Sequence, residues 1–247
     1  MEGKRILVTG SSRGIGRAIA LEIAKSGAKV VVHSMRPSAD TESVVKELGK
    51  NVGGCYHADL SSPRAADLLF EQVVKDGPLH GVVNNAGIYM PMDILKASDA
   101  QFEATYHKTF MVNLESPLRI MRLAAQHFAK RDGGKIVNVC SRVGFKGESG
   151  AAIYAASKAA LINLTRSLAM ELASKKVQVF GIAPGWVDTA MARDGMTERL
   201  PTILKDIPLG RMATPQDCAA TVNFLLSDGA SYLSGNVIDI NGASYFH

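Results

Sequence analysis

Short runs of β-branched and aliphatic residues alternate with longer amphipathic stretches along the chain, and this alternation constrains the fold more than any other feature. The strand-like runs cover residues 5–9, 29–33, 52–57, 81–84, 135–140, 178–182 and 236–240. The helix-like stretches lie between them, at about 15–26, 40–49, 63–76, 99–130, 153–173 and 215–227. Several strand runs are apolar without alternation, which is typical of strands covered on both faces. The sequence therefore predicts an α/β fold, a single-domain doubly wound Rossmann-type fold over residues 1–247 with a seven-stranded parallel sheet.

One long segment, residues 185–215, interrupts this alternation. It contains glycines and prolines but no strand-like run. A segment of this length between a sheet and the last helix of a compact domain usually covers a site. We expect a substrate lid here, and the alternative is a plain surface excursion.

Composition and charge narrow the class of protein. The net charge is +5, but basic residues form no block longer than a pair, so the sequence argues against nucleic-acid binding and suits anionic small ligands. Cys55, Cys140 and Cys218 lie far apart, and the six histidines have no partner at metal-ligand spacing; we therefore expect neither a metal nor a disulfide framework. The apolar run at 6–8 is too short for a signal peptide or a membrane span. The chain is expected to be cytoplasmic, without a membrane partner.

A glycine-rich segment, Thr9-Gly10-Ser11-Ser12-Arg13-Gly14-Ile15-Gly16, connects the first strand to the first helix. Glycines at these positions permit a tight turn and let backbone N–H groups and the positive helix end approach a pyrophosphate. The alternative is a glycine-rich turn without a ligand. The preferred interpretation is a dinucleotide-binding loop, with cofactor contacts from Gly10, Ser12, Arg13, Gly14, Ile15 and Gly16.

The end of the second strand indicates which dinucleotide binds. NAD-binding proteins usually carry a carboxylate there, which accepts a hydrogen bond from the ribose 2′-OH. In this chain the segment after Val32 reads His-Ser-Met-Arg-Pro-Ser, and the first acid is Asp40. Arg36 and Arg13 can meet a 2′-phosphate through their forked donors, unless both are ordinary solvated arginines. The sequence favours NADP(H) over NAD.

Tyr154 and Lys158 are the first candidates for the chemical step. They are four residues apart in a helix-like stretch, so their side chains share one face. A free phenol has a pKa of about 10 and is a poor base at neutral pH. A neighbouring ammonium would favour the phenolate and lower that pKa. The pair can also arise by chance, so it does not by itself establish an active site.

Taken together, these segments resemble the short-chain dehydrogenase/reductase family, and the resemblance covers the whole chain. The family's motifs appear in order, as residues 9–16, Asp59-Leu60, Asn84-Asn85-Ala86-Gly87, Asn113, Ser141, Tyr154 with Lys158, and Pro184-Gly185 with Thr189.

The resemblance implies a role for each matched residue. Tyr154 would be the general acid in carbonyl reduction, and Ser141 would stabilise the same carbonyl oxygen. Lys158 would hold the nicotinamide ribose and depress the tyrosine pKa, and Asn113 would anchor a water in a proton relay. The implied cofactor contacts beyond the glycine loop are Arg36, Asp59, Leu60, Asn85, Ala86, Gly87, Tyr154, Lys158, Pro184, Gly185, Val187 and Thr189.

Within the family, the chain most resembles the 3-oxoacyl-[acyl-carrier-protein] reductases. This implies NADPH-dependent reduction of a 3-oxoacyl thioester, with acyl carrier protein as a candidate partner and a homotetrameric assembly. Two features depart from that group: Met170 stands where an arginine is common, and the C-terminus at 243–247 is unusually aromatic and could reach a neighbouring subunit's site.

Alternatives to this substrate stay open. One is an NADP-dependent reductase or dehydrogenase of a small ketone, sugar or other alcohol. Another is a cofactor-binding regulator without turnover, although the complete set of Ser141, Tyr154 and Lys158 argues against it. Arg142 follows Ser141 directly, and it either faces an anionic substrate or lies on the loop surface.

Overall fold

Seven parallel strands form one sheet in the order β3-β2-β1-β4-β5-β6-β7. The computed structural model describes residues 1–193 and 200–247. The strands are β1 (Arg5–Val8), β2 (Lys29–Ser34), β3 (Val52–His57), β4 (Gly81–Asn84), β5 (Gly134–Val139), β6 (Val177–Pro184) and β7 (Val237–Ile240). The predicted doubly wound parallel sheet is confirmed, and the ends of the predicted strands differ from the observed ones by no more than two residues.

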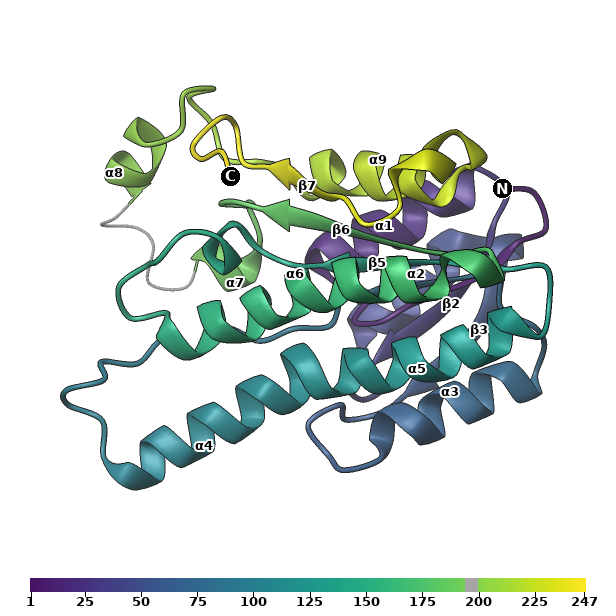
Figure 1. Cartoon of the computed structure of the whole chain (residues 1–247), viewed down its shortest axis with the longest axis horizontal. Coiled ribbons are helices and arrows are strands. Elements are labelled where there is room, and N and C mark those ends of the chain that lie inside the picture. The colour runs from purple at the N-terminus through teal and green to yellow at the C-terminus, as the bar shows by residue number, and fades with distance from the viewer. Residues whose placement is uncertain (194–199) are drawn as a thin grey trace.

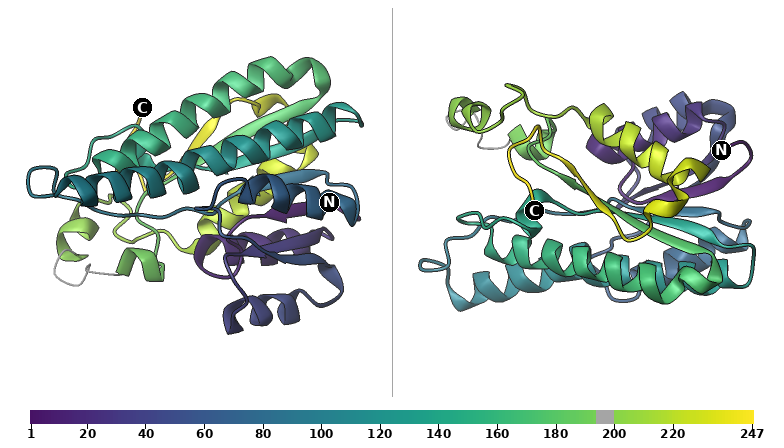
Figure 2. Two further views of the ribbon diagram at one scale, coloured as in Figure 1. Left: turned by 90° about the horizontal axis from the view of Figure 1, so that it is seen from below. Right: turned by 45° about the horizontal axis from the view of Figure 1, so that its top comes forward.

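Helices cover both faces of the sheet (Figures 1 and 2). The helices on one face are α1 (Gly14–Lys25), α2 (Ala39–Leu48) and α9 (Pro215–Leu226). The helices on the other face are α3 (Ala65–Lys75), α4 (Asp99–Phe110), α5 (Ser116–Ala129) and α6 (Ala152–Leu172). Each strand therefore lies between two helical layers.

The apolar strands follow from this layering. In β1, Ile6 and Val8 belong to the core beneath α1 and α9, whereas Leu7 belongs to the core beneath α3 and α5. Successive side chains of a strand point to opposite faces, so a strand buried on both faces needs an unbroken apolar run. Burying one such side chain contributes about 1.5–3 kcal/mol relative to leaving it exposed.

The predicted helix over 99–130 is correct in extent but not regular. A π-helical turn, η2 (Met111–Glu115), separates α4 from α5. Pro117 in the first turn of α5 has no N–H to donate to the carbonyl of Asn113, four residues earlier. The regular α-helical hydrogen-bond pattern is therefore interrupted at this point, and Asn113 lies in the wider π-helical turn.

The segment after β6 leaves the sheet at its carboxyl edge. It contains two short helices that the sequence patterns did not predict, α7 (Ala190–Arg193) and α8 (Leu200–Lys205). A parallel bridge between Val187 and Ala213 closes its base. Part of the predicted lid, residues 194–199, lies outside the described residues.

None of the helices within 1–193 and 200–247 is both long and apolar enough to cross a bilayer. Over the same residues, no three His, Cys, Asp or Glu side chains gather in a group that could hold a metal ion.

Candidate active site

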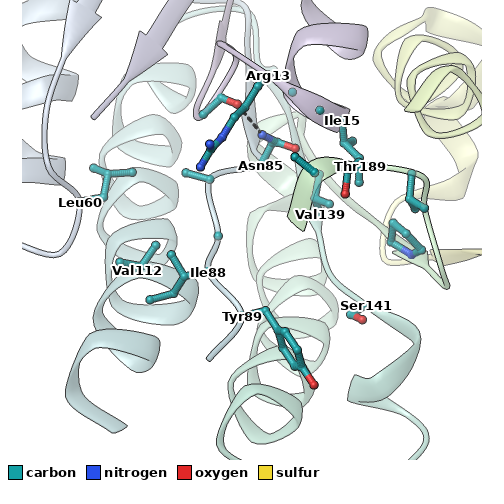
Figure 3. A pocket seen from close by; sticks show the side chains of 18 of the residues that line it. Arg13, Ile15, Leu60, Asn85, Ile88, Tyr89, Val112, Val139, Ser141 and Thr189 are labelled. Carbon is teal, nitrogen blue, oxygen red and sulfur yellow. Dashed lines mark hydrogen bonds between the residues drawn. The ribbon is translucent and has the colours of Figure 1, made fainter. Parts of the chain in front are cut away.

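A cleft of about 740 Å³ lies along the carboxyl edge of the sheet. It brings together every predicted site residue except Asn113: Gly10, Ser12, Arg13, Gly14, Ile15, Gly16, Arg36, Asp59, Leu60, Asn85, Ala86, Gly87, Ser141, Tyr154, Lys158, Pro184, Gly185, Val187 and Thr189. In Figure 3, Arg13 and Asn85 lie at one end, and Tyr89 and Ser141 lie at the other. The cleft thus has a cofactor-loop end and a catalytic end.

The glycine loop packs closely against the segment after β4. The side-chain amide of Asn85 donates to the carbonyl oxygens of Thr9 (2.8 Å) and Gly10 (3.1 Å). A Cβ on Gly16 would lie 2.2 Å from the Gly10 oxygen and 2.3 Å from Nδ2 of Asn85. Only glycine fits at this position, because any side chain would push the two segments apart.

The start of α1 suits an anionic group. Its first residue is Gly14, and the N-cap residue Arg13 makes no side-chain capping hydrogen bond. The first N–H groups of a helix have no partner within the helix and carry a partial positive charge. Together with the glycine loop, this end of the cleft fits the pyrophosphate of a dinucleotide.

His33 supports the glycine loop, and sequence reasoning missed its role. It lies near the end of β2 and is buried. Its Nδ1 accepts from the Gly10 N–H at 3.1 Å, and its Nε2 lies 3.1 Å from the Ala58 carbonyl oxygen. Burial lowers the pKa of His33 to about 4. The neutral ring therefore carries its proton on Nε2, accepts on one side and donates on the other.

The cofactor-loop end of the cleft is rich in exposed charge. Arg13 and Arg36 line it and are both exposed, and the Ser34 hydroxyl donates to the Arg36 carbonyl at 3.0 Å. Asp59 also lines this end, where hydrogen bonds from the hydroxyl and N–H of Ser61 lower the pKa of its carboxyl. Asp40, in the first turn of α2, also lines the cleft.

Ser141, Tyr154 and Lys158 meet at the other end of the cleft. Ser141 follows β5, and Tyr154 and Lys158 lie one turn apart on α6. The Ser141 hydroxyl acts on the Tyr154 phenol and lowers its pKa. The Lys158 ammonium lies 5.7 Å from the centre of the Tyr154 ring and donates to the Val139 carbonyl at 2.8 Å.

Burial has the largest effect on the protonation of Tyr154 and Lys158. Burial raises the pKa of Tyr154 to about 12, and the Ser141 hydroxyl opposes this effect only in part. Burial also lowers the pKa of Lys158 to about 8. The lowering of the tyrosine pKa that we expect from Lys158 acting with the nicotinamide ring stays a prediction. Tyr154 keeps its proton and is suited to donate it.

Asn113 is the predicted site residue that does not line the cleft. Its Oδ1 accepts from the Ile88 N–H at 2.9 Å. Its Nδ2 donates to the Ile88 carbonyl (2.9 Å) and to the Ser157 hydroxyl (3.3 Å). The side chain thus fixes the backbone beside the cleft, and its role in holding a water stays a prediction.

The comparisons with known proteins agree with this geometry. A family model described as enoyl-(acyl carrier protein) reductase matches residues 10–243. The 3-oxoacyl-[acyl-carrier-protein] reductase FabG of Pseudomonas aeruginosa is 36% identical over 248 residues, covering 99% of this chain and 98% of that protein. FabG of Escherichia coli is 35% identical over 245 residues, with the same coverage. The chain belongs to the short-chain dehydrogenase/reductase family. The predicted family and its oxidoreductase class are confirmed.

Solved structures of the family have the same fold. A proposed NAD(P)-dependent gluconate 5-dehydrogenase from Beutenbergia cavernae, with bound NADP at low occupancy, superposes with a TM-score of 0.91 at 33% identity. A proposed short-chain alcohol dehydrogenase from Sinorhizobium meliloti gives 0.91 at 31% identity. Each comparison covers 99% of this chain and 97% of the other.

The cleft of this short-chain dehydrogenase/reductase has walls that the motifs did not identify. Tyr89 and Trp186 line it, and the Tyr89 ring meets Tyr154 edge-on with centroids 5.1 Å apart. Arg142 and Glu148 also line it and form an ion pair of 3.1 Å. Because Arg142 is 6% exposed, the alternative that it lies on the loop surface is wrong.

The C-terminal tail of the enzyme lies against the loop after Ser141. The Tyr245 hydroxyl donates to the Phe145 carbonyl at 3.4 Å. The His247 ring stacks on the Phe145 ring with centroids 3.6 Å apart, and its Nδ1 pairs with Asp239 at 3.1 Å. The tail therefore packs on the active-site loop of its own chain.

Proposed function

We propose that the enzyme uses NADPH to reduce the 3-oxo group of a 3-oxoacyl thioester to a secondary alcohol. The observation that carries the proposal is the meeting of Ser141, Tyr154 and Lys158 at one end of a cleft whose other end fits a dinucleotide. The two FabG relatives, similar over nearly their whole length, support the thioester as the substrate.

The cofactor is NADP(H). The end of β2 carries His33 in place of a carboxylate, and Arg13 and Arg36 are exposed on the adjoining rim. A guanidinium suits a 2′-phosphate dianion. The backbone of the glycine loop and the segment at Asn85 would hold the pyrophosphate and its ribose, and Lys158 would hold the nicotinamide ribose.

The chain's own residues supply the proton and the orientation. NADPH, when bound, supplies the hydride for the carbonyl carbon. Ser141 would donate a hydrogen bond to the carbonyl oxygen and stabilise its developing negative charge. Tyr154 would transfer its phenolic proton to that oxygen, which completes the alcohol. The high pKa of Tyr154 keeps that proton in place until the oxygen becomes basic.

The proposal also covers the location of the enzyme, its assembly, its acyl carrier and its substrate lid. We infer a cytoplasmic homotetramer that takes its acyl group from acyl carrier protein or coenzyme A. Phe102 and Tyr106 stack on the exposed side of α4, and such an apolar patch suits packing against a second copy. The segment 185–215 would serve as the substrate lid, since Trp186, Val187 and Ile203 line the cleft. A monomeric mass in solution at micromolar concentration would contradict the assembly.

A second enzyme function is the interconversion of a small ketone or sugar with its alcohol. The likeness to the proposed gluconate 5-dehydrogenase favours it. A third candidate is a regulator that binds the cofactor without turnover.

The test is loss of NADPH absorbance with acetoacetyl-CoA and with a panel of ketones and sugars. Oxidation of NADPH with acetoacetyl-CoA, and far less of NADH, would support the thioester reductase. Turnover with the other carbonyls alone would support the second function. Absence of turnover with every carbonyl, together with tight NADPH binding, would support the regulator.

A further inference from the structure

Arg142 is a charged residue that is buried beside Ser141. It follows Ser141 directly and begins the short helical turn η3 (Arg142–Gly144). Its side chain is 8% exposed and lines the cleft together with Glu148. A guanidinium is costly to remove from water, so its burial beside a catalytic serine calls for a partner.

The contacts of Arg142 leave hydrogen-bonding capacity unused. A guanidinium has five N–H donors. Nη2 donates to Glu148 at 3.1 Å, and Nη1 donates to the Ser244 hydroxyl at a long 3.4 Å. Among residues 1–193 and 200–247, the buried Nε has no hydrogen-bond partner. Of the atoms of this guanidinium, Nε therefore lacks an acceptor in the described part of the chain.

Glu148 limits what that acceptor can be. Its carboxylate already balances the charge of Arg142, so the pair presents a directed donor rather than a free positive charge. The remaining walls of the cleft include Tyr89, Val143 and Trp186, which offer apolar contact to a carbon chain. This environment suits a neutral oxygen acceptor attached to a short carbon skeleton.

A 3-oxoacyl thioester carries such an acceptor near the reacting carbonyl. Its second carbonyl oxygen sits on a carbon two positions away, and both oxygens can lie on the same side of the chain. Ser141 and Tyr154 would hold the reacting oxygen, and Arg142 is the next residue after Ser141. A simple ketone has no oxygen acceptor on the carbon two positions from its carbonyl group.

We propose that the Arg142 guanidinium donates a hydrogen bond to the thioester carbonyl oxygen and so selects 3-oxo compounds with an oxygen acceptor two carbons from the reacting carbonyl. Glu148 holds the guanidinium in place. This inference rests on the proposed function, because it concerns how the same site distinguishes its substrate. Arg142 is thus a specificity-determining residue.

The competing explanation is structural. Arg142 also links the loop that carries Glu148 to Ser244 in the C-terminal tail. Loss of this link would lower activity toward every substrate alike. Only the specificity role predicts an effect that depends on the second carbonyl, so the ratio of two substrates separates the explanations.

The experiment compares acetoacetyl-N-acetylcysteamine with 2-heptanone in the full-length wild type and in Arg142→Met. The first substrate has the second carbonyl but none of the phosphates of coenzyme A. We expect the ratio of kcat/KM for the thioester to that for the ketone to fall roughly tenfold or more, as for loss of a hydrogen bond from a charged donor. Acetoacetate in a third arm shows whether a carboxylate oxygen can replace the thioester oxygen.

Two further variants distinguish loss of the proposed hydrogen bond from a general disturbance of the folded loop. Arg142→Met leaves Glu148 unpaired, whereas the double variant Arg142→Met/Glu148→Met removes both charges and should show the same fall in ratio. Arg166→Met is the matched control. Arg166 lies over Phe145 of the same loop at 5.5 Å but does not line the cleft, so we expect its ratio to stay at the wild-type value.

The possible results have distinct meanings. A lowered ratio in both Arg142 variants, with NADPH affinity retained, supports the inference. Parallel loss for both substrates, or an unchanged ratio, overturns it while the proposed function stands. If the wild type reduces the ketone but not the thioester, the proposed function fails, and the inference fails with it.

Discussion

The backbone N–H of Gly10 donates to Nδ1 of His33 at 3.1 Å, so the glycine loop rests on a side chain from the neighbouring strand. The backbone of His33 adds to this support, because its N–H donates to the Ser11 hydroxyl (3.0 Å) and its carbonyl accepts from the Ser11 N–H (2.9 Å). On its other edge the ring reaches Ala58, next to Asp59. One residue thus connects two loops at the cofactor-loop end of the cleft.

His33 should therefore affect cofactor affinity more than catalysis. In His33→Leu, the Gly10 N–H loses its acceptor, which costs about 1–3 kcal/mol, and we expect the Kd for NADPH to rise roughly tenfold or more. His33→Asn places an amide oxygen near the position of Nδ1 and should restore much of the affinity. Calorimetric titration with NADPH measures both. Equal affinities in the two variants would show that the hydrogen bond to Gly10 does not matter.

The same residue predicts a pH dependence of stability. Its pKa falls from 6.5 to about 4 on folding, so between these values the unfolded chain binds more protons. The free energy of unfolding should consequently decrease as the pH falls from about 6.5 toward 4, by on the order of 3 kcal/mol from this group. Denaturant titrations of the wild type and His33→Asn at matched pH values isolate the contribution. The difference between the two proteins should change across this range and stay constant above it.

Tyr154→Phe removes the proposed proton donor but keeps the ring. We expect kcat for carbonyl reduction to fall roughly 10²–10⁴-fold, the usual contribution of general acid catalysis. NADPH affinity should stay close to that of the wild type. Steady-state rates and cofactor titration on the same preparation test this. A variant that keeps its turnover would rule out Tyr154 as the acid.

Arg36→Gln tests the choice between NADPH and NADH. The change removes a positive charge from the exposed rim of the cleft, so kcat/KM for NADPH should fall roughly tenfold while that for NADH changes little. Arg17→Gln is a suitable control, because Arg17 pairs with Glu47 and does not line the cleft. Equal losses for both cofactors would mean that Arg36 does not recognise the 2′-phosphate.

Gly16→Ala should disrupt the packing of the glycine loop against the segment after β4. The added Cβ would meet the Gly10 carbonyl oxygen at 2.2 Å and Nδ2 of Asn85 at 2.3 Å, so the loop and the segment after β4 must separate. We expect a lower melting temperature and weak NADPH binding. Gly147→Ala adds a methyl group where nothing lies within 4 Å, and it should leave both quantities unchanged.

Much of the fold and of the cleft could be predicted from the sequence because both depend on local patterns. Apolar runs such as Ile6-Leu7-Val8 identify buried strands. Residues that follow parallel strands, such as Gly10, Asn85 and Ser141, necessarily meet at one edge of the sheet. Motif spacing was therefore sufficient to place every predicted site residue except Asn113 in the lining.

The remaining features depend on contacts between distant segments. His33 acts through Gly10, 23 residues earlier in the chain, and its sequence context resembles any strand end. The burial of Arg142 depends on Glu148 and on the tail at Ser244. The π-helical turn at Asn113 depends on the contacts to Ile88 as well as on Pro117, and the helical period alone gives no sign of it.

The bridge between Val187 and Ala213 has a consequence for how the segment between them can change. The N–H of Asp188 donates to the Ala213 carbonyl at 2.8 Å, and the N–H of Ala213 donates to the Trp186 carbonyl at 2.9 Å. Both ends of the intervening segment are thus fixed to each other, independently of its length and composition. We therefore expect that the part of the segment beyond Thr189 can change in length without disturbing β6 or α9.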